Sequence, residues 1–421
     1  MRKRRFFGLL SLFAALSLVV AACGEEEDGG GGDGGFTPGP LGAVTVESGA
    51  PIRIAVFESL SGDTASLGED QVRGVEIAIN DKGGELLGHP VEIVELDDGC
   101  AAEQGTTGAQ RIVADPQIVG VIGTSCSGAA VPAMEILSEE GYTMISGSNT
   151  SPVLTSIAGE EAEAHLPGYY RVAHNDEVQG AAAAEFVYSE LDITKAATIH
   201  DGDPYTEGLA TAFGASYQEL GGEVVLATSV GVDQKDMKPV LTEVAAADAE
   251  LVYFPIFQPA ADFIAAQAKE VAGLDAAVLM GADGLLSDTY IELPQTEGMY
   301  FSGPQTPTGS DYEEFVAKYE EEFGEKPIQA FHAHAYDATN VLFAAIEEVA
   351  VDEGGTLQID RQALRDAVGA TSGFAGLTGT LTCDEFGDCA DPAIDVVQNT
   401  DEAETIDQVR ANVLFTFEPE E

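Results

Sequence analysis

Basic residues are scarce in this chain of 421 residues. Lysine and arginine together number 18, against 73 aspartate and glutamate residues, so the formal net charge is -55 and the isoelectric point lies near 4.1. A negative field of this size repels phosphate backbones, which excludes nucleic acid as a partner. We interpret the charge as a solvated acidic surface, and not as evidence for a cationic substrate.

A hydrophobic run long enough to span a bilayer is also missing. The run from Phe6 to Ala22 is shorter than the roughly 20 residues that a transmembrane helix needs. It follows the basic residues 2–5 and ends in Val20-Ala21-Ala22-Cys23, which is the pattern of a secretory signal peptide over residues 1–22. A cysteine after two small residues resembles the bacterial lipoprotein box, so we expect cleavage before Cys23 and lipid anchoring on the outer side of the membrane.

The segment after Cys23 has too little apolar surface to fold. Gly24 to Gly35 consists almost entirely of glycines and acidic residues, and two prolines follow shortly. Residues 23–50 are therefore predicted to form a flexible linker. The first strand-like run begins at Ile52, so we expect the globular part to begin near Pro51, with a length that suits two lobes.

Cysteines are few. Apart from Cys23, the chain has Cys100, Cys126, Cys383 and Cys389. An even number in an exported protein predicts two disulfides, for which three pairings are possible. The short spacing favours Cys383 with Cys389, which leaves Cys100 with Cys126. A zinc site is the alternative, but the spacing lacks the Cys-x-x-Cys pairs typical of one.

The rest of the chain alternates between strand and helix patterns. A first series predicts strands at 52–57, 91–96, 118–122 and 142–145, with helices around 72–79, 106–114 and 129–140. A second series predicts strands at 196–200, 224–228, 251–255 and 278–280, with helices at 208–220, 237–246 and 260–272. The predicted fold class is α/β, with two doubly wound parallel-sheet lobes. Their ligands bind at the carboxyl ends of the strands or between the lobes.

Two strand-to-helix loops are rich in small polar residues. Gly123 to Gly128 follows one predicted strand, and Ser146 to Pro152 follows the next. A helix amino terminus at Ser127 would present free N–H groups and a partial positive charge to a carboxylate. Either loop alone is typical of plain capping and turns, whereas two successive loops favour a binding site.

The sequence contains no recognisable catalytic set. The Gly-x-Ser-x-Gly pattern is not met around Ser127, and none of the six histidines can be tied to that serine. His332 and His334 are two apart in a helical segment, so their side chains point away from each other. The acidic segments 201–203 and 384–388 lack the calcium-loop spacing. We therefore expect a protein that is not an enzyme and needs no metal or cofactor.

An ordered set of segments runs along the chain: Ile52–Gly62 followed by Gly68, Leu96–Cys100, Gly123–Ser127, Ser146–Leu154, Ile199–Asp201 with Tyr205–Gly208, and Met280–Gly284. This ordered set resembles the leucine/isoleucine/valine-binding proteins, which are the solute-binding subunits of branched-chain amino acid ABC transporters. The resemblance covers nearly all of the chain from Pro51 and implies a type I periplasmic-binding fold with two lobes joined by three crossovers. We expect lobes at 51–174 plus 303–376 and 175–302 plus 377–421, with hinge crossovers near 173–175, 302–304 and 371–380, where one strand-helix series ends and another begins.

The resemblance also implies roles for individual residues. By motif, Ser127 corresponds to the serine that binds the ligand carboxylate, Thr150 to the threonine that touches both ends of the amino acid, and Asp283 to the acidic residue facing the ammonium. The family's disulfide corresponds to Cys100 with Cys126. The full expected ligand set is Ser127, Asn149, Thr150, Asp176, Tyr205, Phe257 and Asp283.

Three departures concern the identity of the ligand. Leu67 stands where the family often has an aromatic residue, and Phe257-Gln258 replaces a tyrosine pair. Asp283 is one methylene shorter than the usual glutamate. A methylene changes discrimination by only about 1 to 3 kcal/mol, so a different amino acid or a small amide stays open beside leucine, isoleucine and valine.

The predicted function is that of a monomeric, lipid-anchored binding protein that passes an amino acid to the permease subunits of an ABC importer. A ligand-sensing receptor of the same fold is the first alternative, and it would need an output region, none of which follows Glu421 in the sequence. A secreted serine hydrolase is the second, and it would need a base close to Ser127.

Overall fold

The computed structural model describes residues 36–400 and 405–419. The expected signal peptide of residues 1–22 and the expected lipid acceptor Cys23 lie outside these ranges. No helix within them combines the length and the apolar composition that crossing a bilayer requires.

A six-stranded sheet is built from the first strand-helix series. Its strands lie in the order β3-β4-β2-β5-β6-β9, in which β3 is antiparallel to β4 and the other neighbours are parallel. This order is the doubly wound arrangement predicted from the sequence. The strands are β2 (Ile52–Glu58), β3 (Glu85–Leu86), β4 (His89–Asp97), β5 (Ile118–Gly123), β6 (Met144–Ser146) and β9 (Tyr169–Arg171).

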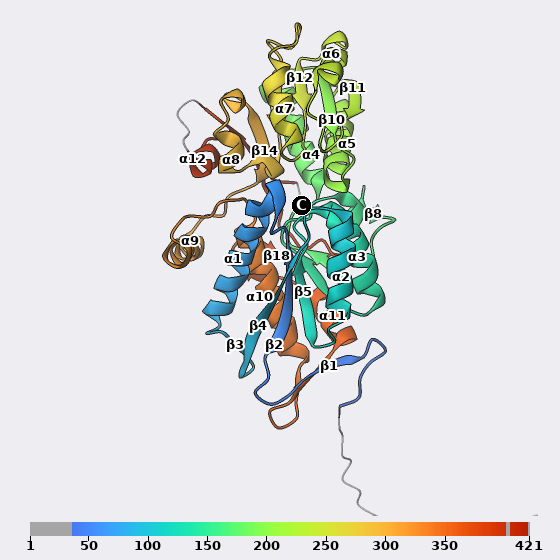
Figure 1. Ribbon diagram of the computed structural model, residues 1–421, viewed down its shortest axis with the longest axis vertical. Coiled ribbons are helices and arrows are strands. Elements are labelled where there is room, and N and C mark those ends of the chain that lie inside the picture. The colour runs from blue at the N-terminus through green and yellow to red at the C-terminus, as the bar shows by residue number, and fades with distance from the viewer. Residues whose placement is uncertain (1–35, 401–404, 420–421) are drawn as a thin grey trace, which may run out of the picture. The chain divides into compact units, whose positions relative to one another are not determined.

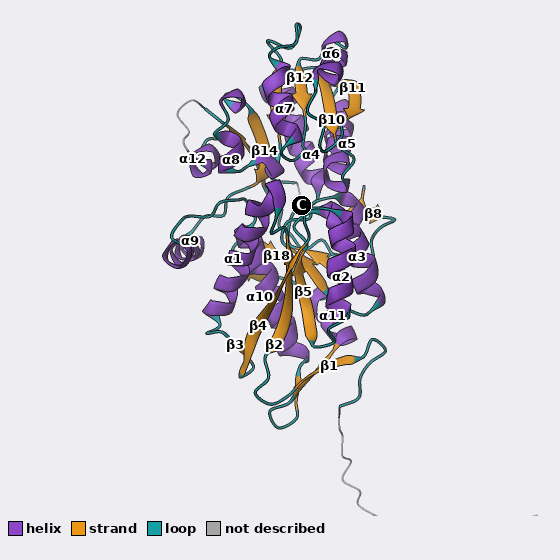
Figure 2. Ribbon diagram, in the orientation of Figure 1, coloured by secondary structure: helices purple, strands orange, loops and turns teal. Residues whose placement is uncertain are grey.

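Helices cover both faces of this sheet (Figures 1 and 2). They are α1 (Ala65–Asp81), α2 (Ala102–Val113), α3 (Ser127–Glu139), α10 (His332–Val349) and α11 (Arg361–Gly369). Successive residues of β2 alternate between the faces. Ile54 and Val56 lie in the core with α1 and α10, whereas Ala55 and Phe57 lie in the core with α2 and α3. Burial on both faces explains the continuous hydrophobic run of this strand.

A seven-stranded sheet is built mainly from the second series. Its order is β11-β10-β12-β13-β14-β19-β20; the first five strands are parallel and the last two pair antiparallel. The strands are β10 (Lys195–His200), β11 (Glu223–Ser229), β12 (Leu251–Tyr253), β13 (Val278–Gly281), β14 (Tyr300–Pro304), β19 (Ile394–Gln398) and β20 (Val413–Phe417).

This second sheet also buries both faces. Its helices are α4 (Asp176–Glu185), α5 (Pro204–Glu219), α6 (Lys238–Ala246), α7 (Ala260–Ala268), α8 (Asp288–Ile291) and α12 (Ile406–Ala411). Ala197 and Ile199 lie in the core with α6 and α7, whereas Ala196 and Tyr253 lie in the core with α4 and α5. The predicted fold class, with two parallel-sheet lobes, is confirmed.

The chain passes three times between the elements that build the two sheets. Residues 172–175 connect β9 to α4, residues 305–309 connect β14 to α9 (Ser310–Phe323), and residues 382–393 connect β18 (Gly379–Leu381) to β19. The first connection contains the expected crossover at 173–175. The other two begin later than expected, because residues 302–304 belong to β14 and residues 371–380 include β17 (Phe374–Gly376), which pairs with β18.

The folded part of the chain begins earlier than predicted, because the compact unit starts at Pro38. Strand β1 (Ala43–Val46) pairs with β16 (Leu357–Asp360), which also pairs with β15 (Val351–Asp352). Val44 and Val46 are 1% and 2% exposed. The alternation Ala-Val-Thr-Val buries every second side chain, so the prediction of a linker over all of residues 23–50 is wrong for this segment.

Two disulfides are present, and both predicted pairings are confirmed. Cys100–Cys126 joins the loop after β4 to the residue that precedes α3, and Cys383–Cys389 closes a short loop between β18 and β19. A small hairpin of β7 (Ser156–Ile157) and β8 (Glu160–Glu161) follows the polar loop that leaves β6.

Candidate functional site

The expected ligand residues lie beyond the carboxyl ends of strands from both sheets. In the first sheet, β5 leads to Ser127 at the start of α3, and β6 leads to Asn149 and Thr150. In the second, β10 leads to Tyr205 in the first turn of α5, and β13 leads to Asp283. This is the edge at which open α/β sheets bind ligands.

The loops of the two sheets contact each other. Ser151 Oγ donates a 2.7 Å hydrogen bond to the carbonyl oxygen of Pro204. Asp203 caps α5 by accepting the amide of Tyr205 at 2.8 Å, and a Cβ atom added to Gly128 would lie only 2.0 Å from Asp203 Oδ2. The start of α5 therefore lies against the start of α3.

Asp283 is a buried carboxyl group held by two donors. Gln179 Nε2 and the Tyr205 hydroxyl both donate to its Oδ1, at 2.7 and 2.9 Å. Burial raises the pKa of Asp283 to about 6, although these two hydrogen bonds offset part of the increase. A buried carboxylate is costly without a positive partner, so this position favours a proton or a cationic ligand group.

Asp176 is a second buried carboxyl group at the site. It begins α4 and is fully buried. Burial, followed by the charge of Asp283, raises the pKa of Asp176 well above its usual range, and the charge of Arg171 offsets only part of this increase. Neither carboxyl oxygen accepts a well-formed hydrogen bond within the described part of the chain. Asp176 and Asp283 together make a buried acidic pair that a positive group would stabilise.

Thr150 and Asn149 offer further polar atoms to this site. Thr150 Oγ1 and Asn149 Nδ2 are buried, and neither has a hydrogen-bond partner among the described residues. The remaining atoms of these residues are well fixed: Thr150 O accepts the amide of Asp176 at 2.9 Å, and Asn149 Oδ1 accepts the hydroxyls of Thr124 and Tyr169, both at 3.2 Å. An unpaired buried polar atom costs on the order of 1 to 3 kcal/mol, so both atoms are available to a ligand.

Ser127 lies where the sequence predicts a carboxylate site. It is the first residue of α3, and its Oγ accepts the amide of Ser151 at 3.3 Å. The first amides of a helix have no partner within the helix and carry partial positive charge, which suits an anion. No histidine is hydrogen-bonded to Ser127 in the described ranges, so the base that a serine hydrolase requires is not provided there.

An apolar cluster adjoins the polar groups through Phe257. Phe257 packs against Tyr205, with ring centroids 5.1 Å apart, and a Cβ atom added to Gly284 would lie 2.7 Å from the Phe257 ring. The same ring packs against a buried cluster that contains Leu67. The buried acidic and amide groups are thus bordered, on the side of Phe257, by an apolar wall. The cluster comprises Leu67, Cys126, Ala173, Ala330 and Phe331, with Cys100 and Phe257 packed against it.

Three residues of the site were not predicted from the sequence. Gln179 follows Asp176 by three positions, which is the spacing of one helix face, so the signal was present. Asp203 followed by Pro204 is a typical helix start, whereas the sequence prediction began this helix at Gly208. Tyr253 ends β12 with its hydroxyl buried and unpaired, and only the fold brings it to the charges of Asp176 and Asp283, which raise its pKa after the larger effect of burial.

No group of three or more histidine, cysteine, aspartate or glutamate side chains within residues 36–400 and 405–419 is arranged to hold a metal ion.

Two open α/β sheets with polar loops facing each other define the type I periplasmic-binding fold. The family of periplasmic binding proteins matches residues 51–391, and the chain belongs to this family.

Relatives with named ligands are among its matches. A Leu/Ile/Val-binding protein homolog of Brucella melitensis is 31% identical over 82% of this chain and 91% of its own length. An amino acid binding protein of Pseudomonas aeruginosa is 34% identical over 61% of this chain, and the match spans 65% of that protein.

Solved structures share the fold. A leucine binding protein from Thermotoga maritima aligns with a TM-score of 0.73 and 26% identity over 84% of this chain and 96% of that protein. A solute binding protein from R. palustris, solved with benzoate, aligns with a TM-score of 0.69 and 21% identity over 83% of this chain and 94% of its own. The fold alone therefore does not specify the ligand.

Proposed function

We propose that this protein is an extracytoplasmic solute-binding lipoprotein of an ABC importer. It captures a branched-chain or related amino acid between its two lobes and delivers it to the permease subunits in the membrane. Membership of the periplasmic binding protein family supports this proposal, as do the relatives whose names specify leucine, isoleucine and valine.

The observation that carries the proposal is that two kinds of binding group are buried where the loops of the two sheets meet. Asp176 and Asp283 are buried carboxyl groups without a well-placed cation, and the amino terminus of α3 at Ser127 suits an anion. An amino acid carries an ammonium and a carboxylate on the same carbon atom. It would therefore satisfy both kinds of group at once.

The acidic pair also argues against an aromatic acid as the ligand. A protein of the same fold binds benzoate in its solved structure, and benzoate has a carboxylate but no ammonium. Such a ligand would leave the carboxyl groups of Asp176 and Asp283 without a positive partner and would add a further negative charge. The cost of unpaired buried charge therefore favours a zwitterion here.

The apolar wall supports an aliphatic side chain. Leu67 and Phe257 contribute to it. Polar residues at these two positions would favour a hydrophilic ligand, whereas the apolar residues that are present favour an aliphatic one. Leucine, isoleucine and valine are the first ligands to test. Each would bury its branched side chain against this wall, at about 25 cal/mol per Å² of apolar surface removed from water.

The decisive experiment is a thermal-shift screen of the mature protein with the common amino acids. A ligand present at 100 times its dissociation constant stabilises the folded state by about 2.7 kcal/mol. We expect leucine, isoleucine or valine to raise the melting temperature, and we expect N-acetyl-leucine and leucinamide to fail, because each lacks one charge of the zwitterion. A shift with benzoate and none with any amino acid would refute the proposal.

Lipid attachment at Cys23 is the second part of the proposal. It rests on the basic residues 2–5, the hydrophobic run that follows and the small residues before Cys23. Mass spectrometry of the membrane fraction should find an amino-terminal peptide that begins with a lipidated Cys23, and Cys23→Ala should release the protein from that fraction. An uncut amino terminus would contradict it.

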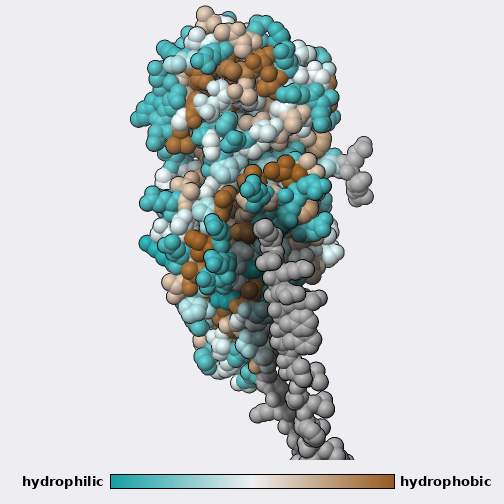
Figure 3. Space-filling model, turned by 90° about the vertical axis from the view of Figure 1, so that its right-hand side faces the viewer, coloured by the Kyte–Doolittle hydropathy of each residue, from teal (hydrophilic) through white to brown (hydrophobic). Residues whose placement is uncertain are grey.

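We also propose that the protein acts as a monomer. On the face shown in Figure 3, hydrophobic residues lie in separate groups among hydrophilic ones. Seven large apolar side chains in the described ranges are exposed, namely Leu87, Ile157, Leu220, Val232, Val351, Val413 and Leu414. The high negative charge opposes self-association as well. Light scattering after size exclusion should give the mass of one chain.

A further inference from the structure

Arg171 has a fully buried guanidinium group that is hydrogen-bonded to the segment Asn149–Thr155, which we call the ligand loop. Its Nη1 donates to the carbonyl oxygens of Asn149 and Ser151, at 3.1 and 2.8 Å. These two residues flank Thr150 on either side. Arg171 Nη2 also donates to Thr155 Oγ1, so three points of the segment from Asn149 to Thr155 are fixed by one side chain.

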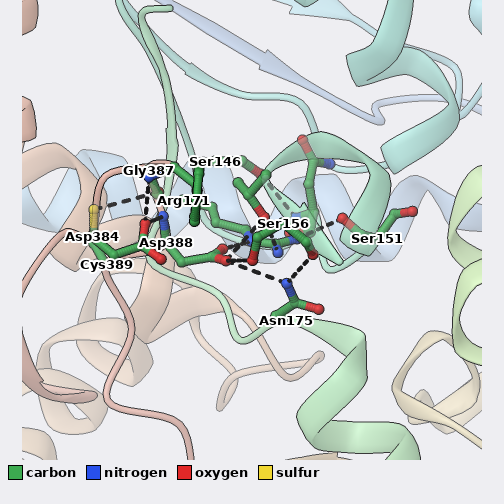
Figure 4. Close-up of polar contacts among 12 residues, drawn as sticks. Ser146, Ser151, Ser156, Arg171, Asn175, Asp384, Gly387, Asp388 and Cys389 are labelled. Carbon is green, nitrogen blue, oxygen red and sulfur yellow. Dashed lines mark hydrogen bonds and ion pairs between the residues drawn. The ribbon is translucent and has the colours of Figure 1, made fainter. Parts of the chain in front are cut away.

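The partner of Arg171 is Asp388, which lies in the loop closed by the Cys383–Cys389 disulfide (Figure 4). Burial would raise the pKa of Asp388, but the charge of Arg171 and the surrounding donors outweigh it, so the net shift is downward. The pair is thus ionised, and a buried ion pair of this kind is strongly directional.

Asp388 reaches a second element of the site. Its Oδ2 accepts the hydroxyl of Thr155 at 3.0 Å and the side-chain amide of Asn175 at 3.3 Å. Asn175 is the N-cap of α4, because its Oδ1 accepts the amide of Glu177 at 3.0 Å. The first residue of that helix is Asp176. One carboxylate therefore contacts both the ligand loop and the cap of the helix that carries the acidic residue.

The loop that carries Asp388 is itself firmly built. Asp384 Oδ1 accepts the amides of Phe386 and Asp388, both at 2.9 Å. Arg171 exchanges main-chain hydrogen bonds with the loop, donating to Gly387 O and accepting from the Cys389 amide, both at 2.9 Å. Figure 4 shows Arg171 beside Gly387 and Asp388 of this loop. The disulfide closes the loop across a separation of 6 residues.

We propose that the disulfide-closed loop 383–389 is a positioning element for ligand binding, with Asp388 and Arg171 as positioning residues. The loop holds Thr150 and Asp176 in the geometry that binds the ligand and makes no contact with the ligand itself. Opening the disulfide would loosen Asp388, and through it both parts of the site, so the affinity of the protein depends on the oxidised state of Cys383 and Cys389. This inference rests on the proposed function for the roles of Thr150 and Asp176.

The first test uses the ligand-free protein and does not depend on which ligand binds. Hydrogen–deuterium exchange is compared among wild type, Asp388→Asn and the Cys383→Ser/Cys389→Ser double variant. We expect the amides of residues 150–156 and 176–178 to exchange about tenfold faster in both variants. The matched control is Asp391→Asn, which removes the same charge nearby from an exposed side chain that contacts Thr380 and not Arg171. Exchange equal to wild type in the double variant would overturn the proposal.

The second test measures binding of L-leucine. Asp388→Asn should weaken binding about tenfold in an otherwise wild-type protein, as is typical when a residue supporting a binding group is changed. In a Thr150→Ala background the same change should weaken binding clearly less than tenfold, because one of the two groups that Asp388 positions is gone and only Asp176 remains. Equal effects in the two backgrounds would indicate a general structural role and count against positioning. If leucine fails to bind the wild type, the proposed function fails, while the exchange experiment still decides the role of the loop.

Discussion

Asp176 and Asp283 are buried carboxyl groups that interact: burial raises the pKa of Asp176, and the charge of Asp283 raises it further. Two such groups cannot both be ionised without cost unless a positive group joins them. The site therefore favours binding of an ammonium group. The interaction between Asp176 and Asp283 determines how substitutions and pH should affect ligand affinity.

Asp283→Ala should abolish most of the affinity for the amino acid. The ammonium would lose its principal partner, at a cost of about 3 to 5 kcal/mol. Ser127→Ala removes one hydrogen bond to the ligand carboxylate and should cost roughly 1.5 to 3 kcal/mol. Isothermal titration calorimetry with leucine measures both. If Asp283→Ala binds as the wild type does, the interpretation of this acidic pair as an ammonium site fails.

Binding should weaken as the pH falls through about 6. The pKa of Asp283 in the ligand-free protein is raised to about 6, whereas the ammonium pairs with the carboxylate form. Binding at pH 5.5 must therefore expel a proton from this group, and binding at pH 7.5 need not. Calorimetry at both pH values, in buffers of different ionisation enthalpy, should show proton release that is larger at the lower pH and reduced in Asp283→Asn.

The raised pKa of Asp283 also predicts how the stability of the folded protein depends on pH. A carboxyl group whose folded-state pKa lies above its unfolded-state value of roughly 3.9 favours the folded state as it takes up a proton. For Asp283, the free energy of unfolding of the ligand-free protein should therefore increase as the pH is lowered from about 7 towards 4. Relief of the general negative charge acts in the same direction, so the difference between wild type and Asp283→Asn isolates this group. An identical pH dependence in the two proteins would contradict the assignment.

Much of the fold could be predicted from the sequence because burial leaves a local pattern. The run at β2 reads as a strand buried on both faces, and Ile54 and Phe57 indeed pack on opposite faces. Strand β1 was missed because only its two valines carry the pattern, and its partner β16 lies more than 300 residues away in the sequence. Strand β1 can be assigned only once its pairing with β16 in the folded structure is known.

The site could be predicted only where a residue sits in a recognisable loop. Ser127 and Thr150 follow strands within polar loops, and they lie where this reasoning expects them. Gln179 contacts Asp283 across 104 residues of sequence, and Arg171 contacts Asp388 across 217. No local pattern encodes such pairs, because they arise when the connections between the sheets bring distant segments together.

Removing the Cys100–Cys126 disulfide should cost more stability than removing Cys383–Cys389. The first spans 26 residues and the second 6. Loop-closure entropy predicts a loss of roughly 2 to 5 kcal/mol for a native disulfide, and a smaller loss by about 1 kcal/mol for the shorter loop. Urea denaturation of the two Cys→Ser double variants gives both values. The reverse order would show that contacts, and not loop closure, dominate.

Gly128→Ala should prevent the lobes from closing on the ligand. The added Cβ atom would lie 2.0 Å from Asp203 Oδ2, and Asp203 cannot easily turn away because it caps α5. Relieving the overlap requires the starts of α3 and α5 to separate, and we expect a loss of affinity of about 1 to 3 kcal/mol. Each lobe should stay folded, because the residue that crowds Gly128 is Asp203, which follows a strand of the other sheet.

The matched control for this change is Gly214→Ala, at a helical position in α5 where the nearest atom, Val224 Cγ2, is 3.5 Å from the added Cβ. It should leave affinity unchanged and stabilise the protein by roughly 0.5 to 1 kcal/mol, because alanine favours a helix interior over glycine. Small-angle scattering with saturating leucine provides the second readout. The wild type and Gly214→Ala should contract on binding as the connections 172–175, 305–309 and 382–393 act as a hinge, whereas Gly128→Ala should stay expanded. Equal contraction in all three proteins would show that closure does not bring Asp203 against Gly128.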